Sequence, residues 1–284
     1  MEKLVVESPA KINVGLNLIT KRADGYHDLE TIFFPLLLSD IISFNKSNKL
    51  SIKSNSKLLN TGNDNLIIKA IRLLEKESNL KFNFEINLEK KIPIGGGLGG
   101  GSSNAAVTLK TINRIMNLGL NSKKLNELSL TLGSDVPYFL NPVPAFAESR
   151  GEKLFPINLE IPYPILLVNP GLNIETRWAF SKIKPFSPSK RLEDIFAKGF
   201  PDFEILKSEV NNDFEIIVFE KYPELKKIKK DLYAAGAQFA LMSGTGSTIF
   251  GIFSNLQKAY WAEDFFKQKY FTFLNNPFKK GSIT

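Results

Sequence analysis

The first 55 residues carry two long apolar runs in which apolar and polar positions partly alternate. Val5 to Ile19 and Leu29 to Phe44 are rich in Val, Ile and Phe, a composition typical of strands. Asp24 and Gly25 stand between the two runs and form a turn signal. The pattern therefore predicts two strands joined by a turn near the amino end of the chain.

Helical spacing follows these strands. Residues 65–79 predict an amphipathic helix whose capping side chains come from Asn63 to Asn65. Residues 82–88 alternate like a strand, and a glycine-rich loop then precedes a second helix, from about Ser103 to Leu118. A third, short helix is predicted over Ser122 to Leu132, before a glycine. The expected inward faces of the first two helices are Ile67, Ala70, Ile71 and Leu74, and Ala106, Leu109, Ile112 and Met116.

The pattern changes after about residue 150. A strand is predicted at Ile165 to Asn169, and helical spacing dominates from Ile174 to Ala235 with a break at Lys184 to Lys190. A strand–glycine turn–strand, a helix and a last strand are expected at residues 240–253, 256–269 and 270–274. Strands and helices without regular alternation predict an α+β fold. The length and the change of composition predict two domains, residues 1–150 and 151–284.

Composition narrows the class of protein. Of the 284 residues, 43% are hydrophobic and 23% charged, the profile of a soluble globular protein. The chain has no cysteine, which excludes disulfides, thiolate nucleophiles and Cys-ligated zinc. The most apolar stretch, Ile32 to Leu38, is too short to span a membrane, and Met1 to Glu7 lacks the apolar region of a secretory signal. We therefore expect a cytoplasmic protein without a membrane partner.

The formal net charge of +8 has two interpretations. One is a well-solvated basic surface, and the other is an anionic partner, either nucleic acid or a phosphorylated small molecule. Because lysine-rich helix faces are common, charge alone favours the first. The lysines expected on one such face are Lys226, Lys227, Lys229 and Lys230.

The most informative segment is the glycine-rich loop at residues 93–104. Six of the seven residues from 95 to 101 are glycine. Glycines let backbone N–H groups turn toward one point and let a ligand approach the main chain. The helix that follows adds the positive end of its dipole. These features predict a cradle for a polyphosphate, whereas a flexible linker would not be bounded so abruptly by an apolar strand and an apolar helix.

The loop differs from two common phosphate-binding motifs. No Lys-Ser or Lys-Thr pair follows the glycines, so it is not a Walker A sequence, and no regular βαβ series surrounds it. Charge neutralisation must therefore come from Mg²⁺, from the helix end and from lysines of other segments, such as Lys11. A second glycine turn, Ser243 to Ser247, is a simple hairpin if taken alone; beside the first loop it would buttress the cradle or touch the substrate.

Four side chains are candidates for chemistry. Lys11 and Asn13 are two residues apart in an apolar strand, so both point to the same face, although a strand lysine is more often a surface residue. Asp135 follows the third helix in an apolar context; it is either a helix cap or a carboxylate that orients or deprotonates an attacking hydroxyl. The single histidine, His27, lies near a turn, where a structural role is the commoner one.

Three stretches resemble the motifs of the GHMP kinase superfamily, in the family's order: Pro9 to Asn13, residues 93–106, and Ser243 to Ser247. Two further stretches, Arg22 to His27 and Ser134 to Pro137, resemble in particular those members of the family whose substrate carries a cytidine diphosphate. The segment Asp-Gly-Tyr-His is the most specific to those members. Matching segments cover nearly the whole chain.

The resemblance implies an ATP- and Mg²⁺-dependent kinase that phosphorylates the 2-hydroxyl of a diphosphocytidyl methylerythritol, in the non-mevalonate route to isoprenoid precursors. It also implies a GHMP kinase fold with an amino-terminal ATP-binding domain and a carboxy-terminal ferredoxin-like domain. The last strand, within Phe273 to Thr284, would return toward the first domain. The protein would act as a monomer or weak homodimer on a small-molecule substrate and bind no nucleic acid.

The resemblance also assigns roles to residues. Asp135 becomes the catalytic base or the carboxylate that orients the hydroxyl, and Lys11 stabilises that carboxylate and the developing charge. Asn13 holds the methylerythritol end of the substrate. Tyr26 and His27 meet the cytidine, and His27 reads the cytosine edge.

Further assignments concern the second domain and the nucleotide. Phe180 matches the aromatic residue that stacks on cytosine, and Thr176 is a further substrate contact, although this segment matches loosely. Tyr138 stands where phenylalanine is frequent in the family. The residues implied to bind ATP are Pro93, Ile94, Gly95, Gly96, Gly97, Leu98, Gly99, Gly100, Gly101, Ser102 and Ser103, and the metal ligands are not implied.

Two alternatives remain open at this point. Another GHMP kinase, acting on mevalonate, homoserine or a sugar, would keep the glycine loop but need no cytidine pocket. A basic nucleic-acid-binding protein would account for the charge and for the 11% aromatic content, but it leaves the loop at residues 95–103 unexplained.

Overall fold

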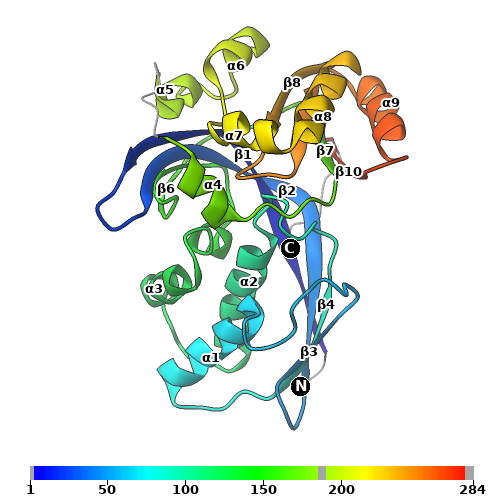
Figure 1. Cartoon of the computed structure of the whole chain (residues 1–284). Helices are drawn as coiled ribbons and strands as arrows, with labels where there is room; N and C mark the ends of the chain where they lie inside the picture. The colour runs from blue at the N-terminus through cyan, green and yellow to red at the C-terminus, as the bar shows by residue number, and fades with distance from the viewer. Residues whose placement is uncertain (1–2, 185–189, 279–284) are drawn as a thin grey trace. The chain divides into compact units, whose positions relative to one another are not determined.

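The computed structural model describes residues 3–184 and 190–278, which form two compact units (Figure 1). Of the described residues, unit 1 comprises 3–10, 38–94 and 99–142, and unit 2 comprises 11–37, 95–98, 143–184 and 190–278. Two long strands, β1 (Leu4–Lys21) and β2 (His27–Lys46), pair with each other and contribute residues to both units. These are the two strands predicted from the apolar runs, and the turn between them is present at Gly25, with φ 85°.

Unit 1 combines a small sheet with helices. The carboxyl half of β2 pairs antiparallel with β4 (Phe84–Glu89), and β3 (Ser51–Ser54) runs parallel to β4. The helices are α1 (Leu66–Ser78), α2 (Gly100–Ile115), α3 (Ser122–Leu132) and the short 3₁₀ helix η1 (Pro137–Leu140). Helices α1, α2 and α3 pack against one another (Figure 1). The predicted face of α1 is buried, and Asn65 caps the helix as expected.

Unit 2 contains two groups of strands. The amino half of β2 pairs with β5 (Ala145–Ser149), which pairs with β6 (Lys153–Pro156). A separate four-stranded antiparallel sheet has the order β10 (Phe271–Asn275), β7 (Ile165–Asn169), β9 (Ile249–Phe253) and β8 (Ala237–Met242). The helices of unit 2 are α4 (Thr176–Lys182), α5 (Leu192–Phe196), α6 (Phe203–Glu209), α7 (Phe214–Lys221), α8 (Pro223–Ala234) and α9 (Leu256–Phe266).

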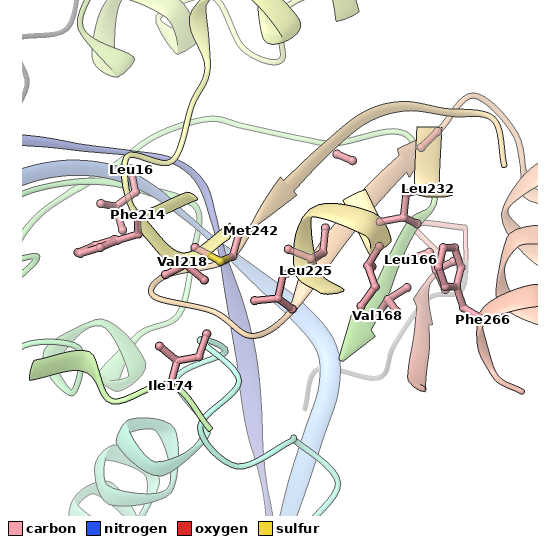
Figure 2. Packing of buried hydrophobic residues seen from close by; sticks show 14 of the residues in the cluster. Leu16, Leu166, Val168, Ile174, Phe214, Val218, Leu225, Leu232, Met242 and Phe266 are labelled. Carbon is pink, nitrogen blue, oxygen red and sulfur yellow. The ribbon is translucent and has the colours of Figure 1, made fainter. Parts of the chain in front are cut away.

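One apolar cluster holds unit 2 together (Figure 2). Met242 of β8 lies near Val218 of α7 in this cluster, which also contains Phe214 of α7, Val168 of β7 and Leu16 of β1. Each fully buried large side chain of this kind contributes about 1.5–3 kcal/mol relative to an exposed one. The cluster therefore fixes β1 to α7 and β8 and sets the position of the β1 residues that precede Leu16.

The structure corrects the predicted limits of α2. The helix begins at Gly100 instead of Ser103, and a Cβ at Gly100 would lie 3.0 Å from Ile92 Cγ2, so the close packing there favours glycine. It ends at Ile115 because Asn117 adopts a left-handed conformation (φ 51°), and Leu118 N donates to Asn113 O. Met116 is consequently a half-buried cap and not part of the inward face.

The sequence pattern missed β5 and β6. Both strands are short, and β6 is largely exposed, so neither shows a clear alternation. Pairing of β5 with β2, and of β6 with β5, supplies the hydrogen bonds that make them strands. The predicted limits of α3 and β7 are confirmed, and those of the other predicted strands and helices differ by at most three residues. The break predicted at Lys184 to Lys190 lies largely outside the described residues, as does the chain end beyond residue 278. The predicted domain boundary near residue 150 stays a prediction.

Within residues 3–184 and 190–278, none of the helices has the length and apolar character that crossing a membrane requires.

Candidate active site

Lys11 and Asn13 lie side by side on β1 in unit 2, and both are buried, at 3% and 2% exposure. The Lys11 ammonium donates to Asn13 Oδ1 at 2.6 Å and lies 4.9 Å from the centre of the Phe33 ring. Its second acceptor is Gly97 O of the glycine loop, at 3.5 Å. The interpretation of Lys11 as a surface residue is therefore wrong. A buried lysine needs compensating groups, and such sites are frequently functional.

All three predicted motifs meet within unit 2. The Lys11 N–H donates to Leu98 O at 3.0 Å, which attaches β1 to the glycine loop. Ser243, in the second glycine turn, donates from Oγ to Gly97 O at 2.9 Å and accepts from Asn13 N at 3.2 Å. Thr248 N donates to Gly96 O at 3.2 Å. The second glycine turn thus buttresses the first loop, which is one of the two roles considered for it.

We predict that Gly97→Ala destabilises the protein strongly. Gly97 has φ 73°, and a Cβ there would lie 2.1 Å from the backbone oxygen of Ser243 and 3.0 Å from that of Gly246, so the backbone of the second glycine turn would have to shift. Backbone strain costs about 1–2 kcal/mol, and the clash should raise the loss in free energy of unfolding above about 3 kcal/mol. Chemical denaturation measures this loss.

Gly171→Ala is the matched control for that variant. Gly171 has φ 78°, but nothing lies within 4 Å of the position of its Cβ. The control therefore reports the backbone cost alone. Equal losses in the two variants would contradict the close approach between the loop and the second glycine turn.

The amino end of α2, in unit 1, lacks the side-chain cap found on several other helices. Asn65, Asn121 and Asn255 cap α1, α3 and α9, whereas α2 starts after Gly99, which has no side chain (φ 70°). No acidic residue lies in its first turn. The first amides of a helix carry partial positive charge and bind anions when no cap occupies them. This end of α2 is therefore suited to a phosphate group.

Two internal contacts hold the first turn of α2 in place. Ser8 of β1 hydrogen-bonds to Ser103 Oγ at 2.8 Å and to Asn104 Oδ1 at 2.7 Å, and all three residues are buried. The Ser103 hydroxyl is thus bonded inside unit 1, and its role toward ATP stays a prediction. Of the other loop residues, Ile94 and Gly95 are exposed, Pro93 and Ser102 are half-buried and Leu98 is buried.

A buried ion pair that the sequence did not reveal lies beside α2. Lys90 Nζ donates to Asp40 Oδ2 at 2.6 Å, and the other oxygen of Asp40 accepts from Lys91 N and Ile92 N. Burial lowers the pKa of Lys90, although the carboxylate of Asp40 acts in the opposite direction. A Cβ at Gly100 would lie 3.0 Å from Lys90 Nζ, so this ammonium is next to the first residue of the helix.

Asp135 lies in unit 1, half-buried in the turn between α3 and η1. Val136 N donates to Gly133 O at 3.1 Å and closes this turn, and the cap residue of η1 is Val136. Asp135 is therefore not the cap residue of η1. The next residues of η1 are buried, and burial raises the pKa of Tyr138 above its usual range. The predicted convergence of Asp135 and Lys11 stays a prediction.

An aromatic group in unit 2 contains two of the predicted substrate contacts. The ring of His27 lies 5.4 Å from that of Phe180, and Phe180 packs edge-on against Phe214 at 4.8 Å. Tyr26 is half exposed, and the guanidinium of Arg150 lies 4.7 Å from the centre of its ring. The structure thus brings His27 and Phe180 together, as their predicted roles require, and adds Arg150, which no sequence signal singled out.

Thr176, the remaining predicted contact, is exposed at the start of α4. Its Oγ1 lies 3.4 Å from Oγ1 of Thr245 in the second glycine turn. The loosely matched segment 170–180 therefore reaches the same turn that contacts Gly97 and Asn13.

The pKa of His27 is expected to lie below the usual histidine value of about 6.5. Burial lowers this pKa, and the positive charge of Lys21 lowers it further. Because protonation of His27 is then easier in the unfolded chain, its contribution to stability is present above the unfolded pKa and is lost as pH falls through the folded value. Since the chain has one histidine, an NMR titration gives a single imidazole signal to follow.

That titration should show a midpoint below the value measured for the same residue in urea. Phe180→Ala, which opens the ring environment, should move the midpoint back toward the unfolded value. A folded-state midpoint at or above the unfolded one would contradict the buried, neutral imidazole.

The described residues contain no group of three or more His, Asp or Glu side chains that could hold a metal ion. A magnesium ion here would accordingly need most of its oxygen ligands from phosphate and water, which is how Mg²⁺ commonly binds at nucleotide sites.

Comparison with known proteins agrees with these features. The model of the GHMP kinases N terminal domain matches residues 65–141, and that of the GHMP kinases C terminal domain matches residues 194–271. A protein from Bacteroides fragilis named 4-diphosphocytidyl-2-C-methyl-D-erythritol kinase is 42% identical over 255 residues, which cover 88% of this chain and 92% of that protein.

Solved structures agree as well. A crystal structure of 4-(cytidine 5'-diphospho)-2C-methyl-D-erythritol kinase has a TM-score of 0.81 and 32% identity, covering 95% of this chain and 98% of that one. The homoserine kinase from Cytophaga hutchinsonii has a TM-score of 0.74 at 17% identity, with 97% and 95% of the two chains covered. At that identity the second likeness concerns the fold alone.

Proposed function

The chain belongs to the GHMP kinases and, within them, to the 4-diphosphocytidyl-2-C-methyl-D-erythritol kinase family, and from this premise we propose its reaction. It transfers the γ-phosphoryl group of ATP to the 2-hydroxyl of 4-diphosphocytidyl-2-C-methyl-D-erythritol. A bond forms between the 2-oxygen and the γ-phosphorus, the bond from that phosphorus to the β,γ-bridging oxygen breaks, and the products are the 2-phosphate and ADP. The step belongs to the non-mevalonate route to isopentenyl diphosphate.

The observation that carries the proposal is the meeting of Lys11, Gly97 and Ser243 in unit 2. Phosphoryl transfer requires little covalent chemistry from the protein and depends on positioning and charge stabilisation. A buried ammonium fixed beside a glycine loop provides a preorganised positive charge, which is worth more in a site that excludes water.

ATP is proposed to bind along residues 93–103. The uncapped amides at the start of α2 would hold phosphate oxygens, and the glycines would let the main chain approach them. A bound Mg²⁺ would neutralise charge on the transferring phosphates, held largely by those phosphates and water. In this assignment Pro93, Ile94 and Leu98 shape the loop and the glycines and Ser102 supply donors, while Ser103, whose hydroxyl is bonded to Ser8, fixes the first turn of α2 beside the phosphates.

Asp135 is proposed to accept or orient the proton of the 2-hydroxyl, and Lys11 to stabilise the charge that develops on the transferring group. Asn13 is proposed to hold the methylerythritol end of the substrate. Both Lys11 and Asn13 are held by hydrogen bonds in their own unit, which supports a preorganised role.

His27, Tyr26 and Phe180 are proposed to bind the cytidine, and Thr176 a polar group of the same substrate. A neutral imidazole offers one donor and one acceptor, which suits the edge of cytosine. The contact between His27 and Phe180 supports one shared pocket for the base. We further propose that the protein acts in the cytoplasm as a monomer or weak homodimer and binds no nucleic acid.

Incubation with ATP, Mg²⁺ and 4-diphosphocytidyl-2-C-methyl-D-erythritol tests the function. Formation of the 2-phosphate, detected by mass spectrometry and by ³¹P NMR, is expected. Mevalonate, homoserine and a sugar serve as competing acceptors, and preferential phosphorylation of one of these would overturn the substrate assignment.

The nucleic-acid alternative is tested separately by titration with an oligonucleotide at two salt concentrations. Tight binding with a steep salt dependence, together with no kinase activity, would favour that alternative.

A further inference from the structure

We propose that Thr31 is a positioning residue that sets the orientation of the Asn13 carboxamide and, through it, the place of the Lys11 ammonium. The inference rests on the proposed function, in which Lys11 stabilises the transferring phosphoryl group. Thr31 lies on β2, the strand that pairs with β1, and its side chain is fully buried.

The hydroxyl group of Thr31 has a hydrogen-bond partner on each side. Its Oγ1–H donates to Gly15 O at 2.6 Å, and its Oγ1 lies 2.9 Å from Asn13 Nδ2. A hydroxyl carries one hydrogen. Because that hydrogen is directed to the Gly15 carbonyl, Thr31 can only accept a hydrogen bond from Asn13.

This restriction decides which end of the Asn13 carboxamide faces each neighbour. An amide presents either its NH₂ or its oxygen, and the two arrangements have nearly the same shape. The acceptor at Thr31 selects the NH₂ group, so the oxygen must face the other way. There it accepts from Lys11 Nζ at 2.6 Å.

The alternative orientation would place two donors against each other. An ammonium has three donors and no acceptor, so a flipped carboxamide would direct its NH₂ at Lys11. Lys11 and Asn13 are both almost fully buried, and an unsatisfied buried donor is costly. In the chain of hydrogen bonds, Lys11 therefore donates to Asn13, Asn13 donates to Thr31, and Thr31 donates to Gly15. The Thr31 hydroxyl fixes this order of donors and acceptors.

Neighbouring contacts limit how far Asn13 can otherwise move. The Asn13 main chain is held by Ser243 Oγ at 3.2 Å, and that hydroxyl also donates to Gly97 O. The backbone of Asn13 is thus fixed by the second glycine turn, and Ser243 Oγ is also 3.5 Å from Asn13 Oδ1, a long contact, whereas Thr31 is the close partner of the carboxamide NH₂ group. The two contacts have separate consequences, which an experiment can distinguish.

Thr31→Val is the informative variant because valine keeps the shape of threonine and removes the hydroxyl. The turnover number is expected to fall by about 10- to 100-fold, since a displacement of about 1 Å in a positioned group can cost about 100-fold. The KM for ATP should change by less than about threefold because the loop is not altered, whereas the KM for the cytidine substrate should rise, because Asn13 is proposed to hold its methylerythritol end. Thr31→Ser, which restores the hydroxyl, should recover most of the turnover.

Thr108→Val provides the control for loss of a buried hydroxyl. Thr108 is fully buried in α2, and its Oγ1 donates to Asn104 O at 2.7 Å. This variant should lower stability to a similar extent as Thr31→Val while leaving the turnover number unchanged. If the two variants lowered turnover equally, the effect of Thr31 would be general destabilisation and the proposal would fail.

A second readout does not depend on activity. In ¹⁵N-labelled protein, the side-chain amide signal of Asn13, assigned by its loss in Asn13→Ala, should exchange slowly with solvent. In Thr31→Val it should exchange faster, because its acceptor is gone, and in Thr31→Ser it should remain protected. Unchanged protection in Thr31→Val would overturn the proposal even if every acceptor tested in the kinase assay were inactive. Absence of product with the wild-type protein would instead refute the proposed function.

Discussion

Asp135→Asn is expected to lower the turnover number by about 10²- to 10⁴-fold, the range that general acid–base groups contribute. Asparagine has nearly the same shape as aspartate but carries no charge and cannot accept the proton of the attacking hydroxyl. Asp135 is not the cap residue of η1, and the turn that holds it is closed by backbone hydrogen bonds, so the fold should persist. Steady-state kinetics with the cytidine substrate measure the effect.

Binding of ATP should be preserved in that variant, because the amides proposed to hold its phosphates belong to residues 93–103. Calorimetric titration with ATP and Mg²⁺ checks this point. Asp264→Asn is the control, since Asp264 is exposed and forms its ion pair with Lys267 on the surface. Turnover close to that of the control would remove Asp135 from the mechanism.

The pH dependence of the same variant distinguishes a base from an orienting group. A true base loses activity on the acid side as its carboxylate is protonated, and the variant then lacks that limb. If the limb persists in Asp135→Asn, another group titrates, and Asp135 orients the hydroxyl without taking its proton.

Lys11→Met is expected to lower the turnover number by about 10²- to 10³-fold, the loss that follows removal of one preorganised charge-stabilising donor. Methionine retains most of the aliphatic stem and removes the ammonium. The variant also leaves Asn13 Oδ1 without its 2.6 Å donor, so some loss of stability accompanies the change. Kinetics and thermal unfolding should therefore be measured together.

Lys229→Met separates the two effects. Lys229 is mostly buried, forms a 2.6 Å ion pair with Glu215 and belongs to unit 2, as Lys11 does. The Lys229→Met variant should be less stable than the wild-type protein but keep its turnover number. A Lys11→Met protein that is as active as this control would show that the ammonium has a structural role only.

The sequence predicted most of the elements because their patterns are local. The face of α1 follows from helical spacing, its start from Asn65, and the limits of α3 and β7 from apolar runs that end at turn residues. The start of α2 was missed because glycine has low helix propensity, yet the structure includes Gly100 in the helix, where it packs closely against Ile92.

The sequence revealed which residue types could act in the site, but it did not reveal how these residues contact one another. Three glycine- or lysine-containing segments were recognised as motifs, yet nothing in their spacing showed that Ser243 bridges Gly97 and Asn13. Lys11 looked like a surface residue from its position in a strand, since burial depends on what covers a face. Asp40 with Lys90, and Arg150 over Tyr26, are pairs distant in sequence, and no local signal marked them.

The sequence by itself determined the family, the order of the motifs and the identities of the candidate groups, because short-range periodicity and residue type are properties of single segments. Only the tertiary structure decided which of these groups touch. The role proposed for Thr31 follows from the pairing of β1 with β2. This pairing directs the one hydroxyl hydrogen of Thr31 to Gly15 O, so toward Asn13 the Thr31 oxygen can act only as an acceptor. Hydrogen-bond direction is a property of neighbours in space, and neighbours in space are assigned by the fold.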